Sequence, residues 1–127
     1  MPDYRKKLTL ETIGGQRMMI LQCNKSEMKS VVRCHASNGT VSWAKETVAS
    51  RHADGKPKHL HILLPDEGVY EVFGQPHLSG SYAIYRGSNG TLYYSAISVP
   101  ERAQVLQAVA SGSTYRAALT TLGKSLF

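Results

Sequence analysis

The chain has 127 residues, of which 42% are hydrophobic and 19% are charged. These values are typical of a globular protein and exclude a chain that is disordered throughout. No run reaches the roughly 18 apolar residues that a membrane span needs, and the N-terminal segment MPDYRKKLTL lacks the apolar stretch of a secretory signal. We therefore expect a single cytoplasmic domain over residues 1–127, with Cys23 and Cys34 as reduced thiols.

The net charge of +6 is distributed unevenly along the chain. Residues 1–65 contain eleven of the fifteen Lys and Arg residues but only five of the nine acidic residues, and residues 66–127 contain four of each. The whole excess of positive charge therefore lies in the first half. Such an asymmetry favours a polyanionic partner that contacts one end of the molecule.

Three dipeptides predict β-hairpins in the first hundred residues: Gly14-Gly15, Asn38-Gly39 and Asn89-Gly90. Each dipeptide tolerates the positive φ angles of two-residue hairpin loops, and each separates two segments of strand-like composition. If Gly14 and Gly15 form the loop of the first hairpin and the residues are paired outward from it, Leu8, Leu10, Met19 and Leu21 lie on one side of the hairpin.

The second hairpin allows a prediction of which residues share a face. With Asn38 and Gly39 as the loop, Ala36 lies opposite Val41 and Cys34 opposite Trp43. One face is then a core face, and the other is a polar, basic face directed toward solvent or phosphates. The core face has Val32, Cys34, Ala36, Val41 and Trp43, and the polar face has Arg33, His35 and Ser42.

Further strands are predicted at residues 58–64 and 69–73, and residues 48–57 are predicted to form the main loop. The third hairpin is apolar on both faces, which is typical of a strand pair that is buried on both sides. With Asn89 and Gly90 as a two-residue loop, one face is predicted to carry Tyr82, Ile84, Tyr93 and Ile97. The other face is predicted to carry Ala83, Tyr85, Leu92, Tyr94 and Ala96.

Two helices are predicted after the last strand. Val105, Leu106 and Val109 have helical spacing in a segment that ends at Gly112. A capped second helix carries Ala118, Leu119 and Leu122, and Gly123-Lys124-Ser125 forms a turn after it. The expected fold class is therefore α+β, with a hairpin-rich antiparallel sheet or partly open barrel over residues 7–98 and a helical cap over residues 100–123.

The segment 100–127 resembles the first two helices and the turn of a resolvase- or transposase-type helix-turn-helix. In that family a third helix follows and enters the major groove of DNA. The 127 residues contain the supporting part of the motif but not a reading helix. The resemblance implies a nucleic-acid partner.

A second resemblance rests on His59 and His61, which point to the same face of a strand. The segment KHLHILL resembles the His-hydrophobe-His strand of the HUH single-strand endonucleases. That resemblance implies a divalent metal on both histidines and a tyrosine nucleophile on a helix, here Tyr115. The same histidines, followed by Glu67 and Gly74, resemble the first motif of cupins, although the spacing is longer and no second motif follows.

Four tyrosines of the third hairpin, Tyr82, Tyr85, Tyr93 and Tyr94, are either core residues or a stacking platform for unpaired bases. The leading hypothesis is a small basic accessory or regulatory protein of the kind that phages or mobile elements carry. It binds DNA or RNA without a catalytic role, and its phosphate-contacting residues are Arg5, Lys6, Lys7, Arg33, His35 and Lys58.

The alternative hypothesis is a protein-interaction module that inhibits or adapts a host protein. A third is the HUH-like, metal-dependent nuclease with His59, His61 and Tyr115. Only the third needs a cofactor, a divalent metal. An open sheet edge is compatible with a homodimer in each case.

Overall fold

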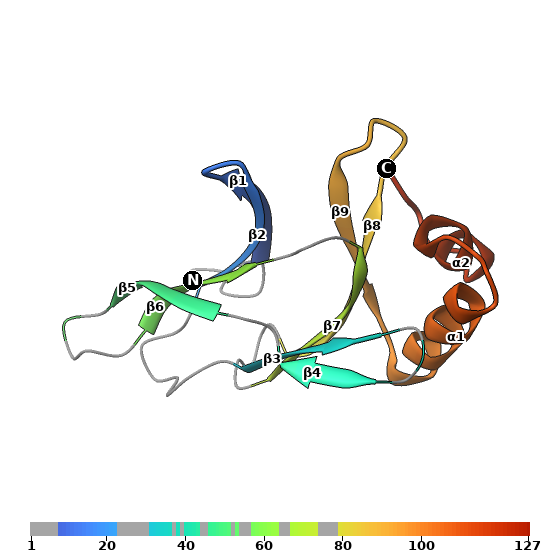
Figure 1. The fold of residues 1–127 in the computed structure, drawn as a ribbon, viewed down its shortest axis with the longest axis horizontal. Helices are drawn as coiled ribbons and strands as arrows, with labels where there is room; N and C mark the ends of the chain where they lie inside the picture. The colour runs from blue at the N-terminus through green and yellow to red at the C-terminus, as the bar shows by residue number, and fades with distance from the viewer. Residues whose placement is uncertain are drawn as a thin grey trace, which may run out of the picture. The chain divides into compact units, whose positions relative to one another are not determined.

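The computed structural model describes residues 8–22, 31–36, 38, 40–43, 46–51, 53, 57–63, 67–73 and 79–127 (Figure 1). These residues form nine strands and two helices. The strands are β1 (Leu8–Ile13), β2 (Gln16–Gln22), β3 (Val31–His35), β4 (Val41–Trp43), β5 (Glu46–Arg51), β6 (Pro57–Leu63), β7 (Gly68–Phe73), β8 (Gly80–Arg86) and β9 (Leu92–Ile97), and the helices are α1 (Val99–Ala110) and α2 (Tyr115–Thr121).

The strands form two open antiparallel sheets, and the α+β class is confirmed. A four-stranded sheet has the order β1-β2-β6-β5, and a five-stranded sheet has the order β4-β3-β7-β8-β9. By contact, the chain divides into two compact units. The first comprises residues 1–32, 43–65 and 72–79, and the second comprises residues 33–42, 66–71 and 80–127. No helix among the described residues is long and apolar enough to cross a membrane.

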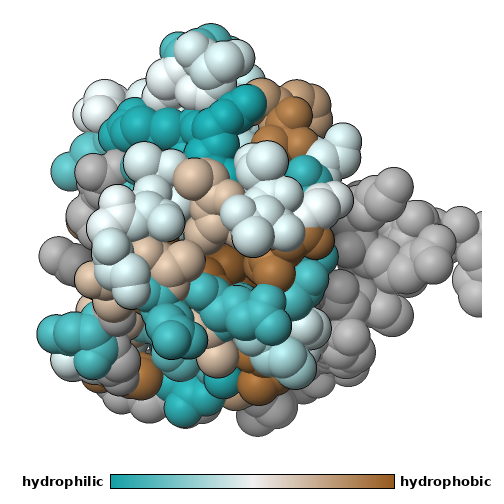
Figure 2. Space-filling view, turned by 90° about the vertical axis from the view of Figure 1, so that its right-hand side faces the viewer, coloured by the Kyte–Doolittle hydropathy of each residue, from teal (hydrophilic) through white to brown (hydrophobic). Residues whose placement is uncertain are grey.

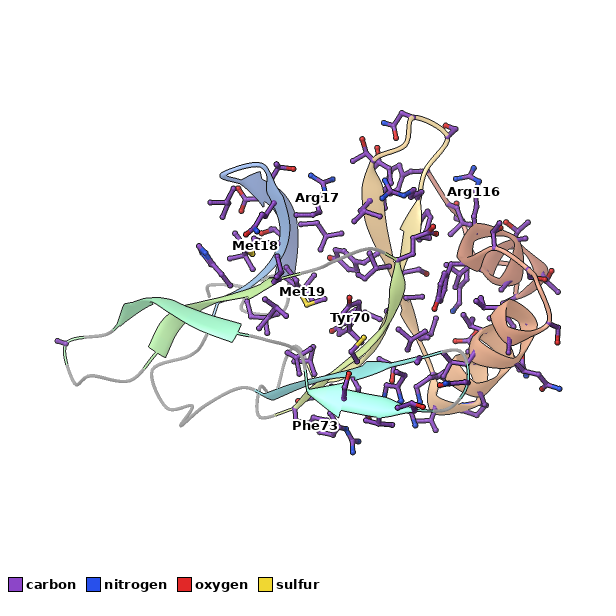
Figure 3. All side chains as sticks on the ribbon, in the orientation of Figure 1. Arg17, Met18, Met19, Tyr70, Phe73 and Arg116 are labelled. Carbon is purple, nitrogen blue, oxygen red and sulfur yellow. The ribbon has the colours of Figure 1, made fainter. Side chains whose placement is uncertain are left out.

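The first hairpin has the predicted register. Leu8 lies opposite Leu21 and Leu10 opposite Met19, so Gly14 and Gly15 form a two-residue loop. Leu8, Met19 and Leu21 are buried. Strand β6 pairs with the other side of β2, which places Ile62 opposite Met19 in the core of the first unit. Figure 3 labels Met18 and Met19, which are neighbours on β2 and differ in burial because alternate residues of a strand face opposite sides.

The third hairpin has a register that differs by one residue from the prediction. Gly87 pairs with Thr91 through a bond of 2.8 Å from its N–H to the Thr91 carbonyl, so the loop contains Ser88, Asn89 and Gly90. Gly90 has a φ of 80°, and the Asn89 side chain accepts a hydrogen bond of 3.0 Å from the Thr91 N–H. A three-residue loop with glycine in the left-handed region is the next most common hairpin connection.

This register exchanges the predicted faces of β9. Tyr85 lies opposite Tyr93, and Ile84 lies opposite Tyr94. The predicted grouping of Tyr93 with Tyr82 is therefore wrong, because a shift of one residue moves every side chain of a strand to the other face. One face carries Ser81, Ala83, Tyr85, Tyr93, Ser95 and Ile97, and the other carries Tyr82, Ile84, Arg86, Leu92, Tyr94 and Ala96.

The second hairpin repeats this difference. The N–H of Ala36 donates to the carbonyl of Thr40 (2.8 Å), so Ala36 lies opposite Thr40 and not Val41. Asn38 accepts from the Thr40 N–H (2.9 Å), as Asn89 does from Thr91. The predicted core face is wrong at Ala36, which is exposed, and at Val41, which is 48% exposed. Ser37 and the side chain of Trp43 lie outside the described residues.

The predicted loop at residues 48–57 is partly a strand. Residues 46–51 form β5, which pairs with β6 and contains register shifts near Ser50. The polar composition of this segment indicated a loop, but the strand lies at the edge of its sheet, where polar residues and bulges are common. Strands β4 and β5 belong to different sheets although only residues 44 and 45 separate them.

The two predicted helices are confirmed and cover the core of the second unit (Figure 1). Ser98 caps α1 with a reciprocal capping box to Glu101, and Thr114 caps α2. Both helices contact β8. The core cluster of this unit is Val69, Ala83, Tyr85, Ile97, Val105, Ala118 and Leu119.

Candidate functional site

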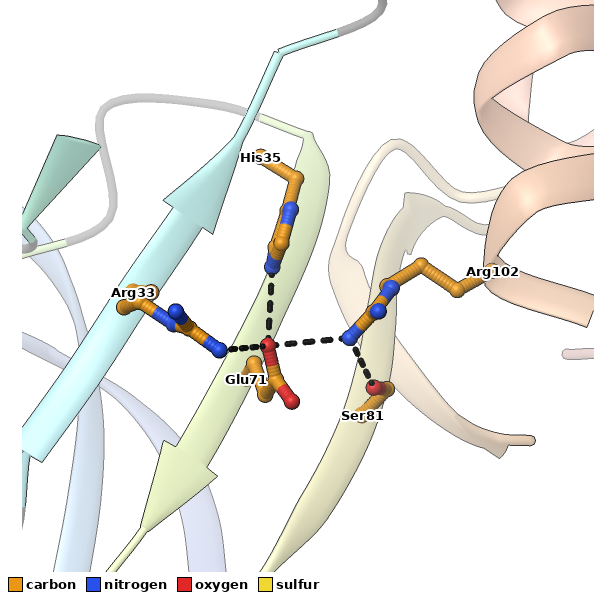
Figure 4. A network of polar contacts seen from close by, with 5 residues as sticks. All are labelled: Arg33, His35, Glu71, Ser81 and Arg102. Carbon is orange, nitrogen blue, oxygen red and sulfur yellow. Dashed lines mark hydrogen bonds and ion pairs between the residues drawn. The ribbon is translucent and has the colours of Figure 1, made fainter. Parts of the chain in front are cut away.

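The main polar cluster of the second unit is built around Glu71 on β7 (Figure 4). Strand β3, a neighbour of β7 in the sheet, supplies Arg33 and His35, which share a face because they are two residues apart. Helix α1 supplies Arg102 from its first turns, and β8 supplies Ser81. Five side chains from four elements therefore meet on one side of the sheet.

A single oxygen of Glu71, Oε1, is contacted by three basic side chains. It lies 2.8 Å from Arg33 Nη2, 3.0 Å from His35 Nε2 and 2.9 Å from Arg102 Nη1. Arg102 also donates to the Ser81 hydroxyl at 3.3 Å. His35 is 9% exposed and the Arg33 side chain is 34% exposed, so the cluster extends from the interior to the surface.

The electrostatics of this cluster favour an ionised carboxylate. Burial by itself would raise the pKa of the Glu71 carboxyl, but the hydrogen bond from His35, the charge of Arg102 and the hydrogen bonds from Arg33 and Arg102 lower that pKa overall. Two guanidinium groups remain charged at any physiological pH. Both of them, with His35, contact one carboxylate oxygen, and Arg33 has a further interaction besides its contact with Glu71.

Of the six predicted phosphate-contacting residues, the structure describes the side chains of only Arg33 and His35. Arg33 and His35 are brought together, although His35 is buried and does not face solvent as predicted. Lys58 lies on β6, but its side chain is outside the described residues, as are Arg5, Lys6 and Lys7 entirely. The role of these six residues in phosphate contact stays a prediction.

The metal-site residues lie on β6, where His61 is opposite Ile20 and His59 is opposite Gln22. That both histidine side chains share one face of the strand stays a prediction. Within the part of the chain that the structure describes, no group of three or more His, Cys, Asp or Glu side chains is arranged to hold a metal ion. The side chain of His59 is not included in that description.

Tyr115, the nucleophile of the HUH-like hypothesis, is the first residue of α2 and packs against the core cluster of the second unit. Burial raises the pKa of its hydroxyl, and the nearby Cys34 and Glu67 raise it further. A higher pKa disfavours the phenolate that would attack a phosphate. The cleavage hypothesis stays a prediction, and the metal content and nuclease activity of a His61→Ala variant would test it.

The four tyrosines of the third hairpin form two pairs on opposite faces. Tyr82 and Tyr94 meet edge to face, with ring centroids 5.8 Å apart. Tyr85 and Tyr93 lie 6.1 Å apart on the other face, and Phe127 stacks on Tyr93. The sequence predicted the tyrosines as a group but missed Phe127, which comes into contact with them only through the path of the chain after α2.

Glu71, Ser81 and Arg102 were also missed. The alternation of Arg33 and His35 on a predicted strand is a signal for a polar site, but no local pattern connects it to a carboxylate 36 residues further along the chain from His35. Only the order of strands in the sheet identifies Glu71 as the partner.

The exposed positions of α1 and α2 carry no charged side chain, and Figure 2 shows hydrophilic and hydrophobic residues intermixed on this side. Every charged side chain between residues 98 and 127 is partly buried, and the exposed positions carry small, amide or hydroxyl side chains and a few apolar ones. The most exposed positions of α1 and α2 include Ala103, Gln104, Gln107, Ala117, Thr120 and Thr121.

Fold and site thus define an α+β protein with two open sheets and a helical cap, in which two arginines and a histidine surround the partly buried carboxylate of Glu71. Comparison of the chain with protein-family models, with curated proteins and with solved structures found no significant match. The resemblance of residues 100–127 to a helix-turn-helix is not tested by these comparisons and stays a prediction.

Proposed function

We propose that this protein binds nucleic acid through its phosphates, as a small accessory or regulatory protein. The observation that supports this function best is the contact of Arg33, His35 and Arg102 with one oxygen of Glu71. Two guanidinium groups converge there, and the side chain of one of them, Arg33, is 34% exposed. Guanidinium groups are well suited to phosphate because their planar donors match its oxygens.

The other described cations of residues 98–127 are engaged within the protein. Lys124 lies 3.0 Å from Glu101, so this pair is neutral. Arg116 donates to the backbone carbonyl of Phe127. The Glu71 cluster is the stronger candidate for an external anion, because two guanidinium groups converge there and Arg33 is partly exposed.

The test is a fluorescence-anisotropy titration of the 127-residue protein with labelled single- and double-stranded DNA and RNA at two salt concentrations. We expect affinity to fall with salt, with a log–log slope of about −0.9 per phosphate contacted on duplex DNA and about −0.7 on a single strand. An affinity that does not change with salt would contradict the proposal.

Two variants with the same change in net charge connect the binding to the cluster. Arg33→Gln removes a cation from the Glu71 cluster and should weaken binding and lower the salt slope by about one phosphate equivalent. Lys124→Gln removes a cation that Glu101 already neutralises and should have little effect. Equal losses in both variants would indicate that only the overall charge matters.

A second candidate function, a protein-interaction module, is favoured by the exposed positions of α1 and α2, which carry no charged side chain. The centres of protein–protein interfaces are depleted of charged residues. A pull-down from nuclease-treated extract should then capture a partner, and Ala117→Arg, at an exposed position of α2, should release it. The control Ser88→Arg adds the same charge at the exposed β8–β9 turn and should retain the partner.

A further inference from the structure

Three aromatic rings form a series that runs from the core of the second unit to its surface. Tyr85 on β8 is 1% exposed and lies opposite Tyr93 on β9, with ring centroids 6.1 Å apart. The ring of Phe127 stacks on Tyr93 with a centroid distance of 4.8 Å and an interplanar angle of 23°. Phe127 itself is 70% exposed. The outermost ring therefore has one face against Tyr93 and much of its surface in solvent.

Hydrogen bonds to both backbone groups of Phe127 fix the position of this residue. The backbone N–H of Phe127 donates to the hydroxyl of Tyr85 at 3.1 Å. Its carbonyl accepts from Arg116, which projects from α2 (Figure 3). The hydroxyl of Tyr93 accepts from the Asn89 side-chain amide at 2.9 Å, which orients the middle ring.

The backbone of the β8–β9 hairpin is shaped to let these rings approach. A Cβ atom at Gly87 would lie 2.5 Å from the ring of Tyr93 and 3.1 Å from the carbonyl oxygen of Phe127. Only glycine fits there without displacing the stack. The series therefore has a defined geometry, although its last member is mostly outside the core.

We infer that Phe127, backed by Tyr93, is a stacking site for an unpaired base, so that the ligand of this protein is single-stranded nucleic acid. This inference rests on the proposed function. A base is a planar ring system that can add to the exposed face of Phe127 and continue the series. Bases of a duplex are already stacked on both faces, which excludes them from the site unless they unpair.

The experiment compares two labelled single strands of equal length, oligo(dT) and an abasic phosphodiester with the same number of phosphates. The wild-type protein should bind oligo(dT) about five- to 140-fold more tightly than the abasic strand, the range expected for stacking of one base. Phe127→Ala should reduce oligo(dT) binding to the abasic level and leave binding of the abasic strand unchanged. Phe127→Trp should retain the preference for oligo(dT).

A matched control and the pattern of results separate this inference from the proposed function. Val99→Ala truncates another exposed apolar side chain, 60% exposed at the start of α1, and should leave both affinities unchanged. If the wild-type protein and Phe127→Ala bind both strands equally well, phosphate binding stands and the stacking site is overturned. If the wild-type protein binds neither strand at low salt, both the stacking site and the proposed function are overturned.

Discussion

Arg102 on α1 lies 2.9 Å from the carboxylate of Glu71 on β7, and this ion pair joins the first helix of the cap to the five-stranded sheet. The same guanidinium bonds to Ser81 on β8. Because Glu71 also binds Arg33 and His35 from β3, it is the common partner of side chains from two other elements. Its removal should therefore have consequences both for stability and for the charge of the site.

We predict that Glu71→Gln lowers the free energy of unfolding by about 1–3 kcal/mol, because the two arginines lose their counter-charge in a partly buried position. Urea unfolding followed by circular dichroism measures this change. Glu11→Gln makes the same chemical change at an exposed position of β1 and should have a much smaller effect. A loss as small as that of Glu11→Gln would show that the cluster does not contribute to stability.

The pH dependence of stability should carry the signature of Glu71. Its pKa in the folded protein is lowered from the ordinary value of 4.5, so it binds protons less readily than in the unfolded chain. The resulting stabilisation is fully present above pH 4.5 and is lost as the pH falls through the lowered pKa. The urea midpoint should fall more between pH 7 and about pH 3 in the wild type than in Glu71→Gln. Equal changes in the two proteins would contradict this assignment.

We predict that Ser98→Ala destabilises the protein by about 1 kcal/mol through loss of the N-cap of α1. The Ser98 hydroxyl accepts from the Glu101 N–H at 3.2 Å, and the Ser98 N–H donates to the Glu101 carboxylate at 2.8 Å. Thermal unfolding measures the effect. Ser125→Ala, at an exposed position after α2, serves as the control and should leave the midpoint unchanged.

Gly87→Ala should destabilise the protein by about 1–3 kcal/mol, because the added methyl group overlaps the Tyr93 ring and the ring has little room to move. Gly68→Ala is the matched control, since its Cβ would lie at an ordinary contact distance of 3.4 Å from the Tyr70 ring. Chemical denaturation of both variants provides the comparison. If Gly87→Ala is tolerated as well as Gly68→Ala, the aromatic series is less tightly packed than its geometry indicates.

The two Ser-Asn-Gly-Thr segments show how far turn chemistry can be used for prediction. Residues 37–40 and 88–91 have the same sequence, and Asn-Gly correctly predicts a hairpin at both. The loop length was wrong by one residue, because Asn38 and Asn89 accept hydrogen bonds from Thr40 and Thr91 and the pairing closes one residue earlier. Since side chains alternate along a strand, this small error exchanged the predicted faces of the following strands.

The sequence by itself determined what depends on neighbouring residues: the α+β class, the hairpins, the cap of the second helix and the register of β1 with β2, because turn chemistry and hydrophobic spacing are local signals. Only the tertiary structure decided which distant side chains meet. Glu71 joins Arg33 and Arg102 because β7 lies between β3 and β8 in the sheet. Phe127 reaches Tyr93 because α2 returns the chain to the β8–β9 hairpin. Strand order and chain path depend on the packing of the whole core, and no local pattern records them.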